Sequence, residues 1–307
     1  MFKMFCEFQS FILFVCFILT VLYIQWRDIN WVNNEADLQF LRNYTPQVKG
    51  QQLRVFLHGP AGAGKSSFIN SVQSVLRGRI YRQALVDNTS HDSFTKEFNT
   101  FKIPKDPESF YPFVFNDTMG LSTTGGILEE DLKLALKGHM KEGYRFNPES
   151  PLPETEEFYN KCPKLNDKVH ILVCVIPATT LSIMSDKVVE KIRKVREEAS
   201  RLKIPQFAML TKIDEAFPEI EVDVQNVYKL PSVKDQMRKF SVDVGIPMNC
   251  IFPVKNYYEE IELNKDMNTL ILSAMKNIIY SGDDFIKFIQ KTLGETGSDK
   301  GRWAPKF

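Results

Sequence analysis

Short apolar runs alternate along the chain with stretches in which apolar residues recur at helical spacing. The runs predict strands at residues 53–58, 112–115, 169–176, 206–210 and 250–254. The third run is almost wholly apolar, which is typical of a strand buried on both faces of a sheet. Residues 188–202 place apolar side chains three or four positions apart and predict an amphipathic helix. Alternating strands and helices indicate an α/β fold with a mainly parallel sheet in a three-layer arrangement.

Several stretches depart from this alternation. Residues 27–50 are polar and mixed, and they predict a linker with one helical turn. Residues 121–165 form a long insert, amphipathic at first and then rich in proline; inserts of that length are usually functional or poorly ordered. The last helix is expected to break near Gly282, and residues 292–307 are expected to form a flexible tail. The folded domain is therefore expected to span residues 51–291.

The N-terminal segment, residues 1–26, is more apolar than the rest of the chain. Residues 8–26 contain only four polar side chains, and a spanning helix needs about 20 predominantly apolar residues. We therefore expect a hydrophobic helix that anchors the protein in a membrane. A cleaved signal peptide is the competing interpretation, although no small-residue cleavage site follows, and an interfacial or ordinarily buried segment stays open.

The net charge and the cysteine content argue against several classes of protein. The chain of 307 residues carries a formal net charge of +1, so no basic excess is available to displace counterions, and no nucleic-acid partner is expected. The five cysteines are scattered and lack the paired spacing of a zinc site. They suit a reducing compartment better than a disulfide framework.

A phosphate-binding motif follows the first predicted strand. The sequence GPAGAGKS at residues 59–66 matches G-x-x-x-x-G-K-[ST], and an amphipathic helix begins directly after it. The glycines let backbone N–H groups turn towards a polyphosphate, and the helix N-terminus adds its positive dipole end. Lys65 supplies charge for the outer phosphates, and the Ser66 hydroxyl can bind Mg²⁺. The candidate phosphate-binding residues are Gly59, Ala61, Gly62, Ala63, Gly64, Lys65, Ser66 and Ser67.

A second motif, DTMG at residues 117–120, ends the next predicted strand. Asp117 is expected to complete the Mg²⁺ shell together with Ser66, so these two residues are the candidate metal ligands. Gly120 can bring its N–H close to a terminal phosphate because it carries no side chain. Together the two motifs predict a site for a nucleotide with Mg²⁺.

The sequence supplies fewer of the groups that would accelerate hydrolysis. Leu121 and Ser122 follow the second motif, so the glutamine that orients an attacking water is missing there, and slow hydrolysis is expected. A switch threonine is expected within residues 80–103. The candidates are Thr89, Thr95 and Thr100, of which Thr89 is favoured.

A third motif predicts the base. The sequence TKID at residues 211–214 follows the strand at 206–210 and matches the guanine reader [NT]-K-x-D. The Asp214 carboxylate can accept hydrogen bonds from guanine N1–H and its exocyclic amine, a pair that adenine lacks. Thr211 and Lys212 complete this candidate site, with the Lys212 stem over the base plane. Lys255, with Asn256, leaves the last strand where a base-supporting loop belongs, and a base contact and a plain loop are equally open.

With three ordered motifs, the chain resembles a P-loop GTPase, and more closely the interferon-induced protein 44 family. Further residues carry this likeness: 67–72, 83–86, 121–122, 144–148 and 271–274. The resemblance implies a cytoplasmic GTP-binding protein of the antiviral immune response. The apolar N-terminal segment departs from the family, where a soluble lead-in is expected.

The sequence therefore predicts a guanine-nucleotide-binding protein that uses GTP and Mg²⁺ and hydrolyses GTP slowly. It is expected to be held on a membrane by residues 8–26 with its nucleotide domain in the cytoplasm, or else to be cytoplasmic. The alternative is a nucleotide-dependent scaffold without turnover, whose insert at 121–165 presents a surface to an unidentified protein partner or to a second copy of the chain.

Overall fold

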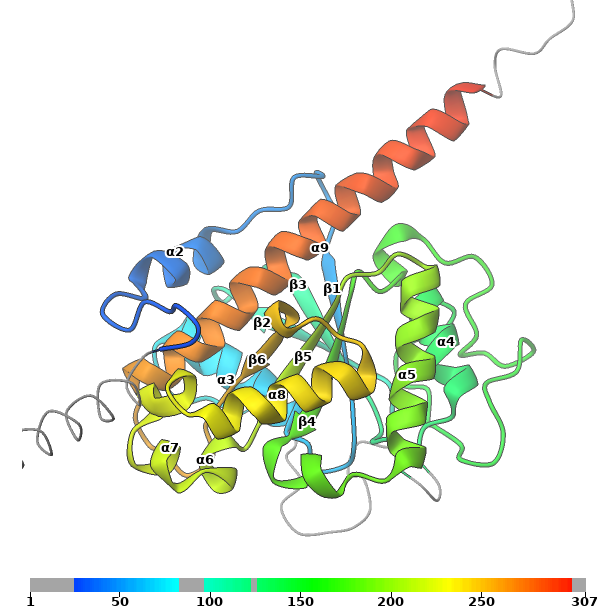
Figure 1. Ribbon diagram of the computed structural model, residues 1–307. Helices are drawn as coiled ribbons and strands as arrows, with labels where there is room; N and C mark the ends of the chain where they lie inside the picture. Colours follow the sequence, from blue (N-terminus) through cyan, green and yellow to red (C-terminus); the bar gives the residue numbers. More distant parts are fainter. Residues whose placement is uncertain (1–24, 83–96, 123–125, 300–307) are drawn as a thin grey trace, which may run out of the picture.

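A computed structural model describes residues 25–82, 97–122 and 126–299, which form a six-stranded sheet covered by helices on both faces (Figure 1). The strand order is β2-β3-β1-β4-β5-β6. β2 runs antiparallel to β3, and every other neighbouring pair is parallel. The mainly parallel α/β fold predicted from the sequence is confirmed.

The strands are β1 (Leu53–His58), β2 (Asn99–Pro104), β3 (Phe110–Asp117), β4 (Ile171–Pro177), β5 (Gln206–Thr211) and β6 (Ile251–Pro253). The α-helices are α2 (Glu35–Asn43), α3 (Lys65–Arg77), α4 (Glu129–Lys137), α5 (Asp186–Arg201), α6 (Ile213–Ala216), α7 (Pro218–Val222), α8 (Pro231–Val244) and α9 (Lys265–Asp299). Short 3₁₀ helices lie at Leu165–Asp167, Ala178–Ile183, Val224–Tyr228 and Met248–Cys250.

Two groups of helices cover the sheet. α3 and α9 pack on one face with α2 against both, whereas α4, α5 and α8 form the other layer (Figure 1). All seven residues of β4 are buried, as expected for a central strand with helices on both faces. Since the parallel strands point the same way, their C-terminal ends meet at one edge, where ligands of such sheets bind.

β2 is a strand that the sequence pattern did not reveal. It overlaps the end of residues 80–103, where the sequence predicts no strand. Ile103 is its only fully buried residue, because β2 is the edge strand and one of its sides has no neighbouring strand. An edge strand of this kind lacks the continuous apolar run by which the other strands were recognised.

Residues 27–50, expected to be a linker, are packed onto the domain. They contain α2, which lies beside α9 (Figure 1), and Leu41 is 1% exposed in the core. At the start of this stretch, the Arg27 guanidinium donates to the carbonyls of Met248 and Ile251, next to β6. The chain is thus fixed to the domain from residue 26 onward, where the Trp26 N–H donates to the Tyr228 carbonyl.

α9 does not break at Gly282 but continues to Asp299. A Cβ atom at residue 282 would lie 2.3 Å from Leu53 Cδ1 and 2.9 Å from Ile171 Cγ1, so glycine lets the helix lie close against the sheet. Residues 292–299, expected in the flexible tail, are therefore helical, and residues 300–307 lie outside the described part of the chain.

The insert at residues 121–165 begins as expected with a helix, α4, and then follows an ordered path. Phe98 N–H donates to the Tyr144 carbonyl at 2.8 Å, and Gly143 N–H donates back to the Phe98 carbonyl at 2.9 Å. Asp131 of α4, fully buried, accepts from the Leu152 N–H at 2.8 Å. These bonds fasten the second half of the insert to both β2 and α4.

Among residues 25–82, 97–122 and 126–299, no helix is both long enough and apolar enough to cross a membrane. The hydrophobic helix expected in residues 1–26 falls almost wholly outside the described residues.

Candidate functional site

The phosphate loop, residues 59–66, joins β1 to α3 at the C-terminal edge of the sheet. Gly59, Gly62 and Gly64 all have positive φ, at 146°, 68° and 87°. A Cβ atom on Gly59 would lie 2.0 Å from the Val175 carbonyl oxygen of β4, so no larger residue fits there. The glycines of the motif are therefore required by the path of the loop against the neighbouring strand.

The second motif packs directly onto this loop. A Cβ atom on Gly120 would lie 2.4 Å from the backbone nitrogen of Ala61. Next to it, the Leu121 N–H donates to the Gly59 carbonyl at 2.9 Å, and Leu121 also pairs with Pro60. The two candidate phosphate-facing loops are thus in backbone contact with each other.

The two candidate Mg²⁺ ligands meet in the structure. The Ser66 hydroxyl donates to the Asp117 carboxylate, which also accepts from the Thr118 N–H at 2.9 Å. Burial raises the pKa of the Asp117 carboxyl, while Lys65 and these hydrogen bonds oppose that shift. A hydroxyl and a carboxylate are hard oxygen donors, and Mg²⁺ is commonly held by one or two such groups together with substrate phosphates, so the donor set fits this ion.

Lys65 is buried, with 7% of its surface exposed. Its ammonium donates to the carbonyls of Pro60 at 3.1 Å and Gly59 at 3.3 Å. Burial lowers the pKa of Lys65, and the nearby Asp117 acts in the opposite direction. The two hydrogen-bond acceptors of this ammonium are neutral carbonyls of the loop, and an anion that enters the loop would compensate the buried charge better than they do.

Thr211 lies at the end of β5 and is fully buried. Its hydroxyl is 2.6 Å from the Ala63 carbonyl of the phosphate loop and 3.2 Å from the Ile176 carbonyl of β4. Asn256 makes a second link, since its side-chain N–H donates to the Gly64 carbonyl at 3.2 Å. Both residues tie the candidate base-reading loops to the phosphate loop, which the sequence motif did not reveal.

Asp214 lies in α6, directly after β5, and Lys255 lies in the loop that follows the adjacent strand β6. The Lys255 ammonium is 3.4 Å from the Asp214 carboxylate and 3.4 Å from that of Glu260. Lys212 lies apart from this group, with positive φ and an ion pair to Glu215 at 3.3 Å. Glu260 had no sequence signal, because its approach to Lys255 depends on how the loop turns.

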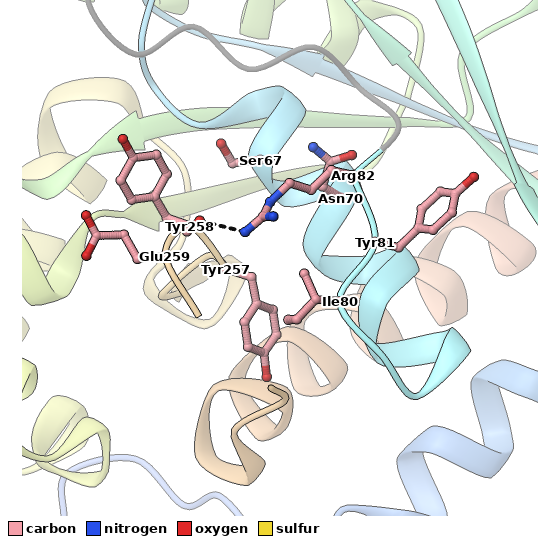
Figure 2. A pocket seen from close by; sticks show the side chains of 8 residues that line it. All are labelled: Ser67, Asn70, Ile80, Tyr81, Arg82, Tyr257, Tyr258 and Glu259. Carbon is pink, nitrogen blue, oxygen red and sulfur yellow. Dashed lines mark hydrogen bonds between the residues drawn. The ribbon is translucent and has the colours of Figure 1, made fainter. Parts of the chain in front are cut away.

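A cavity of about 350 Å³ lies between α3 and the loop after β6 (Figure 2). Ser67 and Asn70 line it from α3, and residues 80–82 and 257–259 complete the wall. In Figure 2 the Arg82 side chain reaches across and donates to the Tyr258 carbonyl at 3.0 Å. The cavity therefore adjoins the phosphate loop at Ser67 and the Lys255 loop on its other side.

Of the three candidate switch threonines, Thr100 lies in the part of the chain that the structure describes. Thr89 and Thr95 lie outside the described residues. Thr100 lies in β2, where its hydroxyl accepts from the Asn116 side-chain amide at 2.9 Å and from Arg54 at 3.4 Å. Thr100 is thus hydrogen-bonded within the sheet.

Comparisons with known proteins agree with the likeness seen in the motifs. The chain is 35% identical over 252 residues to interferon-induced protein 44 of Mus musculus, which covers 81% of the chain and 60% of that protein. It is 32% identical over 253 residues to the Homo sapiens protein, and 30% identical over 267 residues to human interferon-induced protein 44-like. The chain is homologous to interferon-induced protein 44. The predicted resemblance to this family is confirmed, and the chain spans about three fifths of the length of these relatives.

Profiles of known protein families do not match the chain. Among solved structures, a dimerization-deficient mutant of Toc33 from Arabidopsis thaliana aligns with 86% of the chain and 96% of its own, at 13% identity and a TM-score of 0.48. Toc33 in complex with GDP and Mg²⁺ aligns with 77% of the chain and 84% of its own, at 12% identity and a TM-score of 0.42.

Proposed function

We propose that the protein binds GTP and GDP with Mg²⁺ at the C-terminal edge of the sheet and hydrolyses GTP slowly. The observation that carries this proposal is the convergence of the three motifs, with Ser66 in contact with Asp117 and Thr211 bonded to the phosphate loop. In this assignment Lys65 and the loop N–H groups bind phosphates, and Ser66 and Asp117 hold Mg²⁺. Asp214 accepts from guanine, and the cavity beside Ser67 adjoins the phosphate loop.

Two variants test the assignment separately. Lys65→Ala removes the phosphate-binding cation and is expected to abolish GTP binding measured by calorimetry on the full chain. The control is Lys239→Ala, which removes an exposed lysine of α8. A folded Lys65→Ala protein with unchanged GTP affinity would remove the phosphate loop from the proposal.

Asp214→Asn tests the base. Asparagine presents one acceptor and one N–H donor, so a donor meets a guanine donor, whereas xanthine offers a carbonyl at that position. A mismatched buried polar pair costs roughly 1–3 kcal/mol, about 5- to 150-fold in affinity. GTP binding should weaken and xanthosine triphosphate binding should improve. An unchanged preference for guanine would leave a nucleotide-binding protein without this base reader.

A second candidate function is a nucleotide-dependent scaffold without turnover. It is favoured by the sequence after the DTMG motif, where Leu121 pairs with the phosphate loop and no glutamine follows directly. Single-turnover hydrolysis of GTP, measured across a range of protein concentrations, distinguishes the two. Turnover that rises with concentration supports self-association, and none at any concentration supports the scaffold.

We also propose an interferon-linked role in antiviral immunity. The names of the relatives, interferon-induced protein 44 and 44-like, support its link to interferon, and induction of the transcript by interferon tests that link. We further propose that residues 8–26 attach the protein to a membrane with the nucleotide domain in the cytoplasm, where GTP is available. Fractionation of the full chain beside a chain that begins at residue 25 tests this; equal amounts of both in the membrane-free fraction would contradict it.

A further inference from the structure

Asp214, Lys255 and Glu260 form a chain of alternating charges beside the proposed base site. The Lys255 ammonium lies between the two carboxylates, at 3.4 Å from each. About a fifth to a quarter of each side chain is exposed, at 22%, 19% and 25% in sequence order. The ammonium therefore has a defined position next to the carboxylate that is proposed to read guanine.

The loop that carries Lys255 is held at several points. Glu260 accepts from the Tyr258 N–H at 2.9 Å, and Arg82 binds the Tyr258 carbonyl (Figure 2). The Tyr257 N–H donates to the Ser71 hydroxyl of α3 at 2.9 Å. Asp214 and Glu260 also raise the pKa of Lys255 against the effect of its burial, so the ammonium stays charged. A donor fixed in this way needs little reorganisation to bind a ligand.

The hydrogen-bonding edge of guanine presents O6, N1–H and the 2-amino group side by side. A carboxylate can accept from the two donors, and an ammonium beside it can donate to O6. A carboxylate has lone pairs for about four hydrogen bonds, so Asp214 can serve the base and Lys255 together. Adenine carries an amino group in place of O6, and that donor would face the ammonium.

We infer that Lys255 is a direct guanine contact that donates to O6, and that Glu260 is a positioning residue that holds it there. This inference rests on the proposed function, because it assumes that guanine binds at Asp214. It assigns guanine specificity to three charged side chains in place of a single carboxylate.

The test is calorimetric titration of the full chain with GTP and with 6-thio-GTP, which keeps the N1–H and 2-amino donors but replaces O6 by sulfur, a weak acceptor. Lys255→Met is expected to weaken GTP binding about ten- to hundredfold, as for a lost hydrogen bond to a charged group. The same variant should weaken 6-thio-GTP binding less than about threefold. Lys239→Met serves as the matched control and should match the wild type with both ligands.

Glu260→Gln should reduce the preference for GTP over 6-thio-GTP by a smaller factor. It should have no further effect in a Lys255→Met background, because Glu260 acts through Lys255. Circular dichroism and thermal unfolding verify that each variant is folded.

Equal losses for both ligands in Lys255→Met would mean that Lys255 only orients Asp214, and would overturn the inference. No loss for either ligand would overturn it as well. A wild-type chain that binds neither GTP nor GDP would instead overturn the proposed function itself.

Discussion

Thr211→Val removes one hydroxyl from the junction between β5 and the phosphate loop. The Thr211 oxygen is 2.6 Å from the Ala63 carbonyl, and both residues are fully buried, so water cannot replace the lost donor. Valine has nearly the same shape, so little cavity is created. Leaving a buried carbonyl unsatisfied costs about 1–3 kcal/mol. At roughly 2–4 °C per kcal/mol, the melting temperature should fall by about 2–12 °C.

Thermal unfolding by circular dichroism measures this change, and GTP titration of the same protein measures the effect on the loop. GTP affinity should fall as well, because the Ala63 carbonyl belongs to the loop that carries the phosphate-facing N–H groups. Thr211→Ser keeps the hydroxyl and should retain most of the stability. The reasoning would be refuted if valine left the melting temperature unchanged, or if serine destabilised the protein as much as valine does.

Three further changes test other features of the structure. Gly120→Ala should lower the melting temperature more than Gly50→Ala. A Cβ atom at Gly120 would meet backbone at 2.4 Å, whereas one at Gly50 would meet nothing within 4 Å and would suffer only from the positive φ of 78°; a larger effect at Gly50 would contradict the close packing of the two loops. Gly282→Ala should destabilise by about 1–3 kcal/mol through overpacking, despite the ~1 kcal/mol by which alanine favours a helix; a gain in denaturant-measured stability would show that α9 has room. Burial, with Lys65 nearby, lowers the pKa of His58 from 6.5 to about 3, so only the unfolded chain takes up this proton between those values. As the pH is lowered below about 6.5, the free energy of unfolding should therefore decrease more steeply in the wild type than in His58→Gln, by up to about 1.4 kcal/mol per pH unit. Urea denaturation at a series of pH values measures both slopes, and parallel profiles would contradict the assignment.

The sequence predicted those parts of the site whose required residues are close together along the chain. The phosphate loop needs glycine where φ is positive, and a lysine and a serine at the start of a helix, so its requirements lie within eight consecutive residues. The central strands were recognised because burial on both faces demands a continuous apolar run. β2 was not predicted, because an edge strand needs fewer apolar residues. Within β2, only Ile103 is fully buried.

Features that depend on distant partners could not be predicted in this way. A glycine within a helix commonly marks a weak point, and nothing near Gly282 in the sequence indicates that Leu53 lies against it. Glu260 carries no motif, and its role follows only when Lys255 is seen between two carboxylates. The roles of Thr211 and Asn256 were missed for the same reason, since each binds a carbonyl of a loop more than a hundred residues away in sequence.

The second half of the insert illustrates how few contacts can order a long segment. Tyr144 joins the backbone of Phe98 just before β2, and Asp131 of α4 accepts from the Leu152 N–H. Burial raises the pKa of the Asp131 carboxyl to about 6. Phe98 follows the stretch in which the switch threonine was sought, and α4 follows the loop that begins at Asp117. The same segment is therefore fastened next to both, and the periodicity of the insert alone cannot reveal that link, because the bonding partners at Phe98 and Asp131 are distant in sequence from the residues they hold.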